Sequence, residues 1–380
     1  MSKTQAEDYL SKRFKPLQSL LCCPVSRGEL SLLSLPELIS RLPEHERARV
    51  PPETTAAFVS ESVALAYPVI GQIISFLEQD ALHLRDAETT ACMPADQEAA
   101  DVKRSVKGWY DSFGWKKDER GLYHDTALFS QSKPAGHGLY ELESHLSLLS
   151  RLAGGAFVLD AASGAIAHPE KLAYSWFYRY RVSVDLSLAA LKEADAKVGE
   201  KGYCCLADIC RLPFRDDSFD GIVSAYTIQH IPDSQQAQAV KELYRVLHPS
   251  AHLCIITDVA HTRWHEGIVF ACRATKKILK TLGLVGRSAP EAQAHETVTG
   301  SEPPHSLYFV THDWKWWQRV GNKVTNRSSL ECLRLFTKPE YELLFGQSTK
   351  PAKVIRVLQT CFPRLLARGS AFCLLDLYKP

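Results

Sequence analysis

The stretch that most constrains the fold runs from Gly155 to Asp185. An apolar run closed by Asp160 is followed by a loop of small residues, and a second apolar-rich run is closed by Asp185. Strand, tight loop, crossover and strand form the opening unit of a parallel α/β sheet. Ligands of such sheets bind beyond the carboxyl ends of the strands, where we expect both acids to lie.

The acids and the small residues of this stretch predict different roles. Ser163 and Gly164 allow the backbone to turn sharply and to approach a ligand closely. Asp185 is placed to accept two hydrogen bonds from a ribose diol, because a carboxylate is an acceptor with room for both donors. Asp160 would hold the loop through backbone N–H groups or face a charged end of the ligand. Either acid alone could be an ordinary turn residue at a strand end, whereas together they favour a nucleoside ligand.

The loop also indicates which nucleoside fits. A dinucleotide site requires G-x-G-x-x-G at the start of a helix, so that the pyrophosphate rests on the helix N-terminus. Here the frame is Ala162-x-Gly164-x-Ile166, which keeps one of those glycines. A ligand without phosphates is favoured, and S-adenosylmethionine fits this requirement.

The following segments continue the α/β pattern. A third strand ends at Asp208, a turn containing Asp220 leads into a fourth, and an amphipathic helix precedes a fifth that ends before Asp258. From Val158 to Asp258 the chain resembles the core of class I S-adenosylmethionine-dependent methyltransferases. The segments LPF…DSFD and LYRVLHP carry most of this resemblance.

The resemblance implies a cofactor site, with S-adenosylmethionine as methyl donor and S-adenosylhomocysteine as product. It places Asp185 on the ribose, Asp208 on the adenine amino group and Tyr226 beside the methyl group. The implied cofactor-binding residues are Asp160, Ala162, Ser163, Gly164, Asp185, Leu186, Asp208, Ile209 and Tyr226. We further expect the carboxylates of Asp160, Asp185, Asp208 and Asp220 to converge on this ligand. The related loops usually have glycine where this chain has Ala162 and Ile166.

Catalytic and acceptor-side residues are predicted less directly. His230 follows the fourth strand and is the candidate proton acceptor, with Tyr226 as a second catalytic candidate; a lone histidine can equally be structural. The dense aromatic segment after residue 108 is either a packing clamp or a lid over the site. The candidate acceptor-binding residues are Tyr110, Trp115, Tyr123 and His168.

The N-terminal segment carries a second resemblance. CPV-x-x-G-x-L, which starts at Cys23, and AYPV, which ends at Val69, resemble the small zinc-ribbon-like proteins that activate RNA and protein methyltransferases. A structural zinc needs four sulfur or nitrogen ligands. Ser26 stands where a second cysteine would be expected, and Ser60 and Ser62 offer no thiol. We therefore predict a packing domain without metal.

The sequence as a whole predicts an α/β protein with a doubly wound, mostly parallel, seven-stranded Rossmann-like sheet and a small N-terminal β-rich domain. The predicted parts are a zinc-ribbon-like domain at 1–85, a linker with an aromatic and helical segment at 86–150, and a methyltransferase domain at 151–380. The substrate-binding tail begins near residue 261. In this tail we predict strands at 307–311, 333–336 and 372–378.

Composition narrows the possible partners. The 45 basic and 43 acidic residues give a net charge of +2, which provides no electrostatic case for nucleic acid. No apolar run approaches the roughly 20 residues of a membrane span, so no membrane is expected as partner. The N-terminus has no apolar core of a signal peptide, and eleven cysteines, most in predicted strands or helices, favour a reducing cytoplasm.

The expected function is methyl transfer to a small-molecule metabolite or natural product by a cytoplasmic enzyme, with oligomers possible. One alternative is an RNA or protein methyltransferase, suggested by the activator-like N-terminus. A second is a non-enzymatic binding module, suggested by the few glycines in the loop and the missing zinc ligands.

Overall fold

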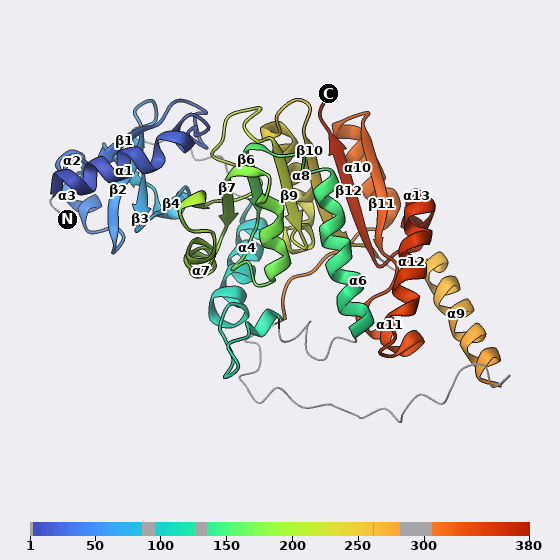
Figure 1. Cartoon of the computed structure of the whole chain (residues 1–380). Coiled ribbons are helices and arrows are strands. Elements are labelled where there is room, and N and C mark those ends of the chain that lie inside the picture. The colour runs from blue at the N-terminus through green and yellow to red at the C-terminus, as the bar shows by residue number, and fades with distance from the viewer. Residues whose placement is uncertain (1–2, 86–95, 127–134, 261, 282–305) are drawn as a thin grey trace.

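One mixed sheet runs through the protein. The computed structural model describes residues 3–85, 96–126, 135–260, 262–281 and 306–380 (Figure 1). Twelve strands form the sheet in the order β1-β2-β3-β4-β8-β7-β6-β9-β10-β12-β11, and β5 pairs with β3 beside this path. The strands are β1 (Ser31–Ser34), β2 (Thr54–Ser60), β3 (Leu65–Ile70), β4 (Ile73–Ser75), β5 (Leu82–His83), β6 (Gly155–Ala161), β7 (Tyr178–Asp185), β8 (Gly202–Leu206), β9 (Gly221–Ala225), β10 (His252–Asp258), β11 (Ser328–Arg334) and β12 (Phe372–Tyr378).

Helices cover both faces of the sheet. The α-helices are α1 (Lys3–Gln18), α2 (Leu35–Arg41), α3 (Glu44–Arg47), α4 (Gln97–Trp109), α6 (Ala135–Leu146), α7 (Leu188–Val198), α8 (Asp233–Val246), α9 (Arg263–Thr281), α10 (Trp314–Val324), α11 (Lys338–Phe345), α12 (Lys350–Cys361) and α13 (Pro363–Leu366). Short helices of other types are η1 (Glu78–Asp80), η2 (Tyr110–Gly114), η3 (Ser147–Ser150), η4 (Pro169–Ser175), η5 (Gly199–Lys201), η6 (Ile228–His230) and η7 (Ala367–Gly369). Within the described residues, no helix is both long and apolar enough to cross a bilayer.

The central strands are buried on both sides. Strands β8, β7, β6, β9 and β10 are parallel, and β12 then runs antiparallel between β10 and β11. Alternate residues of β6 face different cores: Leu159 packs with α1, α8 and α10, whereas Val158 packs with η3 and η4. Burial on both faces explains why these strands read as nearly continuous apolar runs.

The N-terminal strands belong to the same sheet. Strand β4 pairs in parallel with β8, with Ile73 opposite Cys204 and Ser75 opposite Leu206. The sequence predicts a seven-stranded sheet and a separate small β-rich domain, so the continuous twelve-stranded sheet differs from that expectation. Without β4, strand β8 would expose an unpaired backbone edge, which folded proteins usually cover. Figure 1 shows the blue N-terminal strands continuing from the green ones.

Ser26, Ser60 and Ser62, which stand where cysteine ligands of a zinc ion would be expected, lie close to Cys23. The Cys23 sulfur lies 3.4 Å from the Ser26 amide nitrogen and 3.3 Å from the Tyr67 hydroxyl. The Ser62 hydroxyl donates to that of Ser26 over 3.0 Å and lies 3.1 Å from that of Ser60. The three serines and one cysteine thus form a hydrogen-bonded cluster where two cysteine pairs would be needed for zinc.

Two predicted segments have a different structure. The polar, alanine-rich sequence from Glu78 to Lys103 predicts a linker, whereas in the structure α4 begins at Gln97, because the Asp96 side chain accepts a hydrogen bond from the Ala99 amide and Val106 is buried; residues 86–95 of that linker lie outside the described part. Residues 307–311 form no strand. Instead the Val310 amide donates to the Gln229 carbonyl over 2.8 Å, which holds this segment across the end of the sheet.

Candidate functional site

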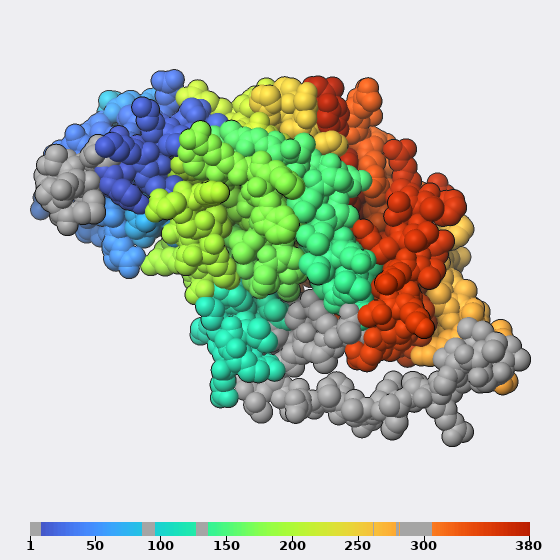
Figure 2. Space-filling view, viewed as in Figure 1, coloured from blue at the N-terminus to red at the C-terminus, as the bar shows by residue number. Residues whose placement is uncertain are grey.

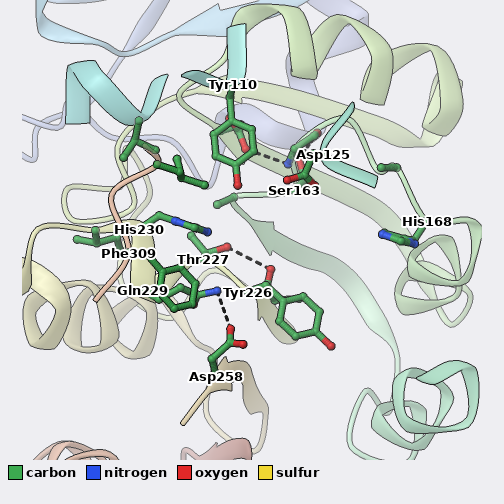
Figure 3. A pocket seen from close by; sticks show the side chains of 18 of the residues that line it. Tyr110, Asp125, Ser163, His168, Tyr226, Thr227, Gln229, His230, Asp258 and Phe309 are labelled. Atoms are coloured by element: carbon green, nitrogen blue, oxygen red, sulfur yellow. Dashed lines mark hydrogen bonds between the residues drawn. The ribbon is translucent and has the colours of Figure 1, made fainter. Parts of the chain in front are cut away.

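A cavity of about 880 Å³ lies at the carboxyl ends of the central strands. Its walls come from the loops after β6, β7, β8, β9 and β10, with α4, α6 and α11 closing the sides. Figure 3 shows Tyr110, Tyr226 and His230 around the same space. This is the position at which ligands bind in open α/β sheets, and the volume suits a cofactor together with a small acceptor.

Asp185 presents its carboxylate to the cavity from the end of β7. The Gly164 amide donates to Oδ2 and the Ser187 amide donates to Oδ1, both over 2.9 Å. These bonds fix the side chain while leaving further lone pairs for donors inside the cavity. Burial raises the pKa of Asp185 to about 6. The carboxylate is therefore ionised at neutral pH and oriented to accept hydrogen bonds from a diol.

Asp208 supplies a second carboxylate after the neighbouring strand β8. Its Oδ1 accepts a hydrogen bond from the Cys210 amide over 2.9 Å, and its Oδ2 is paired with the Lys103 ammonium group. Leu186 and Ile209 give the cavity apolar walls beside the two acids. A flat ring with an amino group fits between such walls, and this arrangement suits a nucleoside.

Asp160 and Asp220 do not join this pair. Asp160 is 5% exposed and is paired with the Arg181 guanidinium inside the sheet, so its side chain does not line the cavity, where it was expected to face a charged end of the ligand. Asp220 precedes β9 instead of following a strand, and it accepts hydrogen bonds from the amides of Ala156 and Phe157 at the opposite end of the sheet. The expected convergence of four carboxylates is therefore wrong for these two.

The loop after β6 has left-handed backbone at the positions where related loops carry glycine. The φ angles are 57° at Ala162, 55° at Gly164 and 48° at Ile166. A Cβ on Gly164 would come within 2.5 Å of the Trp115 ring, so glycine is required there. Ala162, Ser163 and Gly164 all line the cavity, as expected from the sequence.

Replacing Ala162 by glycine is expected to raise the free energy of unfolding by about 0.5 kcal/mol. Alanine costs about 1–2 kcal/mol in the left-handed region, and the greater freedom of glycine in the unfolded chain offsets part of that gain. Denaturant titration measures the change. Ala161→Gly, in the buried strand β6, is the control and should destabilise; a lower stability for Ala162→Gly would contradict the strain argument.

The aromatic segment divides between the cavity and its support. Tyr110 and Trp115 line the cavity, and their rings stack with centroids 5.0 Å apart. Tyr123 does not line it: its hydroxyl donates to Glu193 over 2.7 Å, and its ring meets Trp115 edge-on at 6.0 Å. Tyr110 and Trp115 therefore lie in the cavity wall, whereas Tyr123 packs against Trp115 outside it.

One ring nitrogen of His230 forms a hydrogen bond with the backbone, and the other keeps its lone pair. Nδ1 lies 2.9 Å from the Tyr308 carbonyl oxygen. Since a carbonyl can only accept, Nδ1 carries the proton and Nε2 carries the lone pair. Burial lowers the pKa of His230, so the ring is neutral at neutral pH. Its position in the cavity wall and this tautomer make it suited to accept a proton.

Tyr226 is held by a charged residue that sequence patterns do not reveal. It follows β9 with a φ angle of 59°, an uncommon conformation for an aromatic residue. Arg334, at the end of β11, donates to the Tyr226 hydroxyl over 2.7 Å and lies 3.3 Å from Glu141. Arg334 is 4% exposed, and its guanidinium carbon lies 3.9 Å from the Phe372 ring centroid. The phenol is thereby fixed at the cavity wall.

Besides the candidate His168, the ionisable residues Asp125, Lys171 and Asp258 also line the cavity. His168 lines the cavity as expected, away from His230 in Figure 3. Lys171 and Asp125 share this region; burial lowers the pKa of Lys171 and raises that of Asp125 to about 6. Burial likewise raises the pKa of Asp258, after β10, to about 6. Asp258 had a visible signal, an acid directly after an apolar run, whereas Asp125 and Lys171 had none.

Replacing Asp125 by asparagine is expected to stabilise the ligand-free protein at pH 7.5 by about 1–2 kcal/mol, which is less than the roughly 3 kcal/mol of the full pKa difference because solvent screens part of the charge. The folded-state pKa of about 6 lies above the ordinary value of 3.8, so the ionised carboxylate destabilises the fold above pH 6. This penalty fades as pH falls through 6 and vanishes near 4.

Denaturant unfolding of both proteins between pH 4 and 7.5 measures that difference. Asp118→Asn is the control, for which we expect a change in stability of the opposite sign. The hydrogen bond from the Leu122 amide lowers the pKa of Asp118, so replacing its carboxylate by asparagine should destabilise the protein at neutral pH. A gain for Asp125→Asn that does not change with pH would contradict the assignment.

Comparison with known proteins identifies the central region. Residues 159–255 match the family model described as a methyltransferase domain. A demethylmenaquinone methyltransferase from Streptomyces avermitilis is 29% identical over 145 residues, which are 36% of this chain and 57% of that protein. A rice chloroplast 2-methyl-6-phytyl-1,4-hydroquinone methyltransferase is 39% identical over 82 residues, 21% of this chain and 23% of that protein. The chain thus spans less than two thirds of these relatives.

Solved structures resemble the chain more distantly. The YcgJ protein of Bacillus subtilis has a TM-score of 0.36 at 17% identity and covers 63% of this chain and 99% of its own. Phosphoethanolamine N-methyltransferase 1 of Haemonchus contortus has a TM-score of 0.44 at 12% identity and covers 74% of this chain and 50% of its own. TM-scores below 0.5 do not establish a common architecture, so the fold is described by the strand order given above.

Proposed function

We propose that the protein transfers a methyl group from S-adenosylmethionine to a small-molecule acceptor. The observation that carries this proposal is the pair Asp185 and Asp208, which line one cavity from the ends of adjacent parallel strands. The first fits a ribose diol, and the second fits the amino group of adenine. The match of residues 159–255 to a methyltransferase domain supports the same reading.

The residues present fit this cofactor. Gly164 brings the loop backbone close to the cavity without a side chain, and the fixed Asp185 carboxylate accepts donors there. The loop has no triple-glycine phosphate frame, in agreement with a ligand that has no phosphates. When bound, the sulfonium would supply a methyl group that is already electrophilic, so the protein need not activate it.

The chain's own residues would then orient the acceptor and remove its proton. Tyr110 and Trp115 line the cavity as a stacked pair and would orient the acceptor, and orientation accounts for much of the rate in such transfers. The Nε2 lone pair of His230 accepts the proton that the acceptor loses. Arg334 holds the Tyr226 hydroxyl in place at the wall beside the acceptor.

The acceptor class that we propose is an aromatic compound with an ionisable hydroxyl group. Aromatic side chains from three elements border the cavity, including Tyr110, Phe309 and Phe372, and a base is needed only for an acceptor with a proton to lose. The names of the two relatives above, a demethylmenaquinone and a hydroquinone methyltransferase, support this class.

Calorimetry with S-adenosylhomocysteine, and with NAD as the control ligand, tests the cofactor. Binding of the first and not of the second is the expected result; binding of neither contradicts the proposal. A panel of hydroquinones and phenols with radiolabelled S-adenosylmethionine then tests the acceptor. Binding without turnover on the panel would favour the non-enzymatic alternative.

A further inference from the structure

Helices α12 and α13 turn apolar side chains toward solvent. Val354, Val357 and Leu358 are 61%, 62% and 44% exposed, and their spacing of three and four residues puts them on one side of α12. The opposite side of the helix, with Ala352 and Ile355, is buried. The helix therefore has two apolar faces, of which the fold uses one.

The exposed apolar strip continues past the end of α12. Phe362 is 52% exposed and Leu365 is 54% exposed. Large apolar residues exposed singly are normal, whereas a contiguous group marks an interaction site. Figure 2 shows the red surface of this C-terminal region uncovered on the viewed face.

Helix α9 repeats the pattern next to the same core. Trp264, Phe270 and Ile278 are 63%, 73% and 59% exposed. The inner side of α9, through Val269, packs in one apolar cluster with Ile355 of α12. Two amphipathic helices thus cover one core and both present large apolar side chains outward.

The charge around these side chains is predominantly positive. Residues 343–375 contain five basic residues and no acidic residue, and α9 contains five basic residues and one acidic residue. Lys350, Lys353 and Arg364 are exposed, and within the described part of the chain no carboxylate forms an ion pair with them. A chain of net charge +2 therefore concentrates positive charge at one end.

The combination of apolar and basic side chains selects the partner. A second copy of this chain would bring two positive surfaces together, which opposes association. A nucleic acid would use the positive charge and leave the aliphatic side chains in water. An anionic bilayer surface uses both, because apolar side chains enter the interface while lysine and arginine contact lipid phosphates.

We propose that the outward faces of α9, α12 and α13 dock on an anionic lipid bilayer. This is peripheral binding, a mode different from the membrane spans that the sequence argues against. The docked face adjoins the cavity through α11, whose Pro339 and Glu342 line it, since the Lys276 ammonium group on α9 donates to the Leu343 carbonyl over 2.7 Å.

Sedimentation of the full chain with vesicles tests the proposal. We expect binding to phosphatidylcholine vesicles that contain phosphatidylglycerol, weaker binding to pure phosphatidylcholine, and loss of binding at high salt. The double variant Val357→Asp/Leu358→Asp should weaken binding by about tenfold or more, and Lys353→Glu/Arg364→Glu should do the same. Val25→Asp, which changes a valine 40% exposed in the N-terminal segment, is the matched control and should bind as the unchanged protein.

Three results would overturn the proposal. One is the absence of binding to either vesicle by a folded protein with an unchanged melting temperature. Another is an equal loss of binding in the Val25→Asp control. The third is the detection by light scattering of a dimer that the Val357→Asp/Leu358→Asp variant does not form, together with no binding to vesicles. That result would assign the face to contact with a second copy of the chain. None of these results depends on methyl transfer, so the cofactor proposal is tested separately.

Discussion

Replacing His230 by asparagine is expected to lower kcat by about 10²–10⁴ fold while leaving the affinity for S-adenosylhomocysteine within about twofold. The asparagine amide can still donate to the Tyr308 carbonyl, as Nδ1 of the histidine does over 2.9 Å, but it has no basic nitrogen to replace Nε2. The variant therefore separates the base from the structural hydrogen bond. Steady-state kinetics with an active acceptor and calorimetry with the product measure the two effects.

The pH dependence gives an independent check on the same residue. Because burial lowers the pKa of His230 below its ordinary value of 6.5, the neutral base persists at neutral pH and protonation reduces kcat only below pH 6.5. The acid limb of the profile should disappear in His230→Asn. A variant that keeps kcat within about threefold, with the acid limb intact, would remove His230 from the proton transfer.

Replacing Asp185 by alanine is expected to weaken binding of S-adenosylhomocysteine by about a hundredfold or more. Two hydrogen bonds from a diol to a carboxylate contribute about 1.5–3 kcal/mol each, and 1.4 kcal/mol corresponds to a factor of ten. Calorimetry measures the affinity. An unchanged affinity in a folded variant would remove the ribose assignment.

Asp185→Asn controls for the structural role of the carboxylate. The asparagine oxygen can still accept from either the Gly164 or the Ser187 amide, so one of the two bonds to the loop is kept while the other and the negative charge are lost. We expect an intermediate affinity. For the unchanged protein the affinity should fall as pH falls through about 6, because the protonated form of Asp185 loses an acceptor.

Sequence patterns predicted the parallel core because each of its strands is a short apolar run, buried on both faces. The same patterns placed Asp185 and Asp208 correctly at the cavity, since Asp185 ends β7 and Asp208 lies two residues beyond β8. Asp220 was misplaced although its order in the chain distinguishes it: it comes before its strand, and the amino ends of parallel strands lie at the other edge of the sheet.

Other features depend on contacts between distant segments. The pairing of Asp160 with Arg181 follows from the register between β6 and β7, which local sequence does not determine. Arg334 reaches Tyr226 across 108 positions of sequence, and nothing near either residue marks the other. The pairing of β4 with β8 likewise joins distant segments that local sequence does not connect, so a seven-stranded sheet was expected where one continuous sheet of twelve strands exists.

That joined sheet has a consequence for the nucleoside site. The Phe76 amide donates to the Leu206 carbonyl over 2.8 Å, two residues before Asp208. Strand β8, which leads to the acid that we propose faces adenine, thus has its outer edge hydrogen-bonded to a segment from the beginning of the chain. Excising residues 3–85 would leave the outer edge of β8 unpaired, so the first part of the polypeptide helps to define the geometry of a pocket that it does not line.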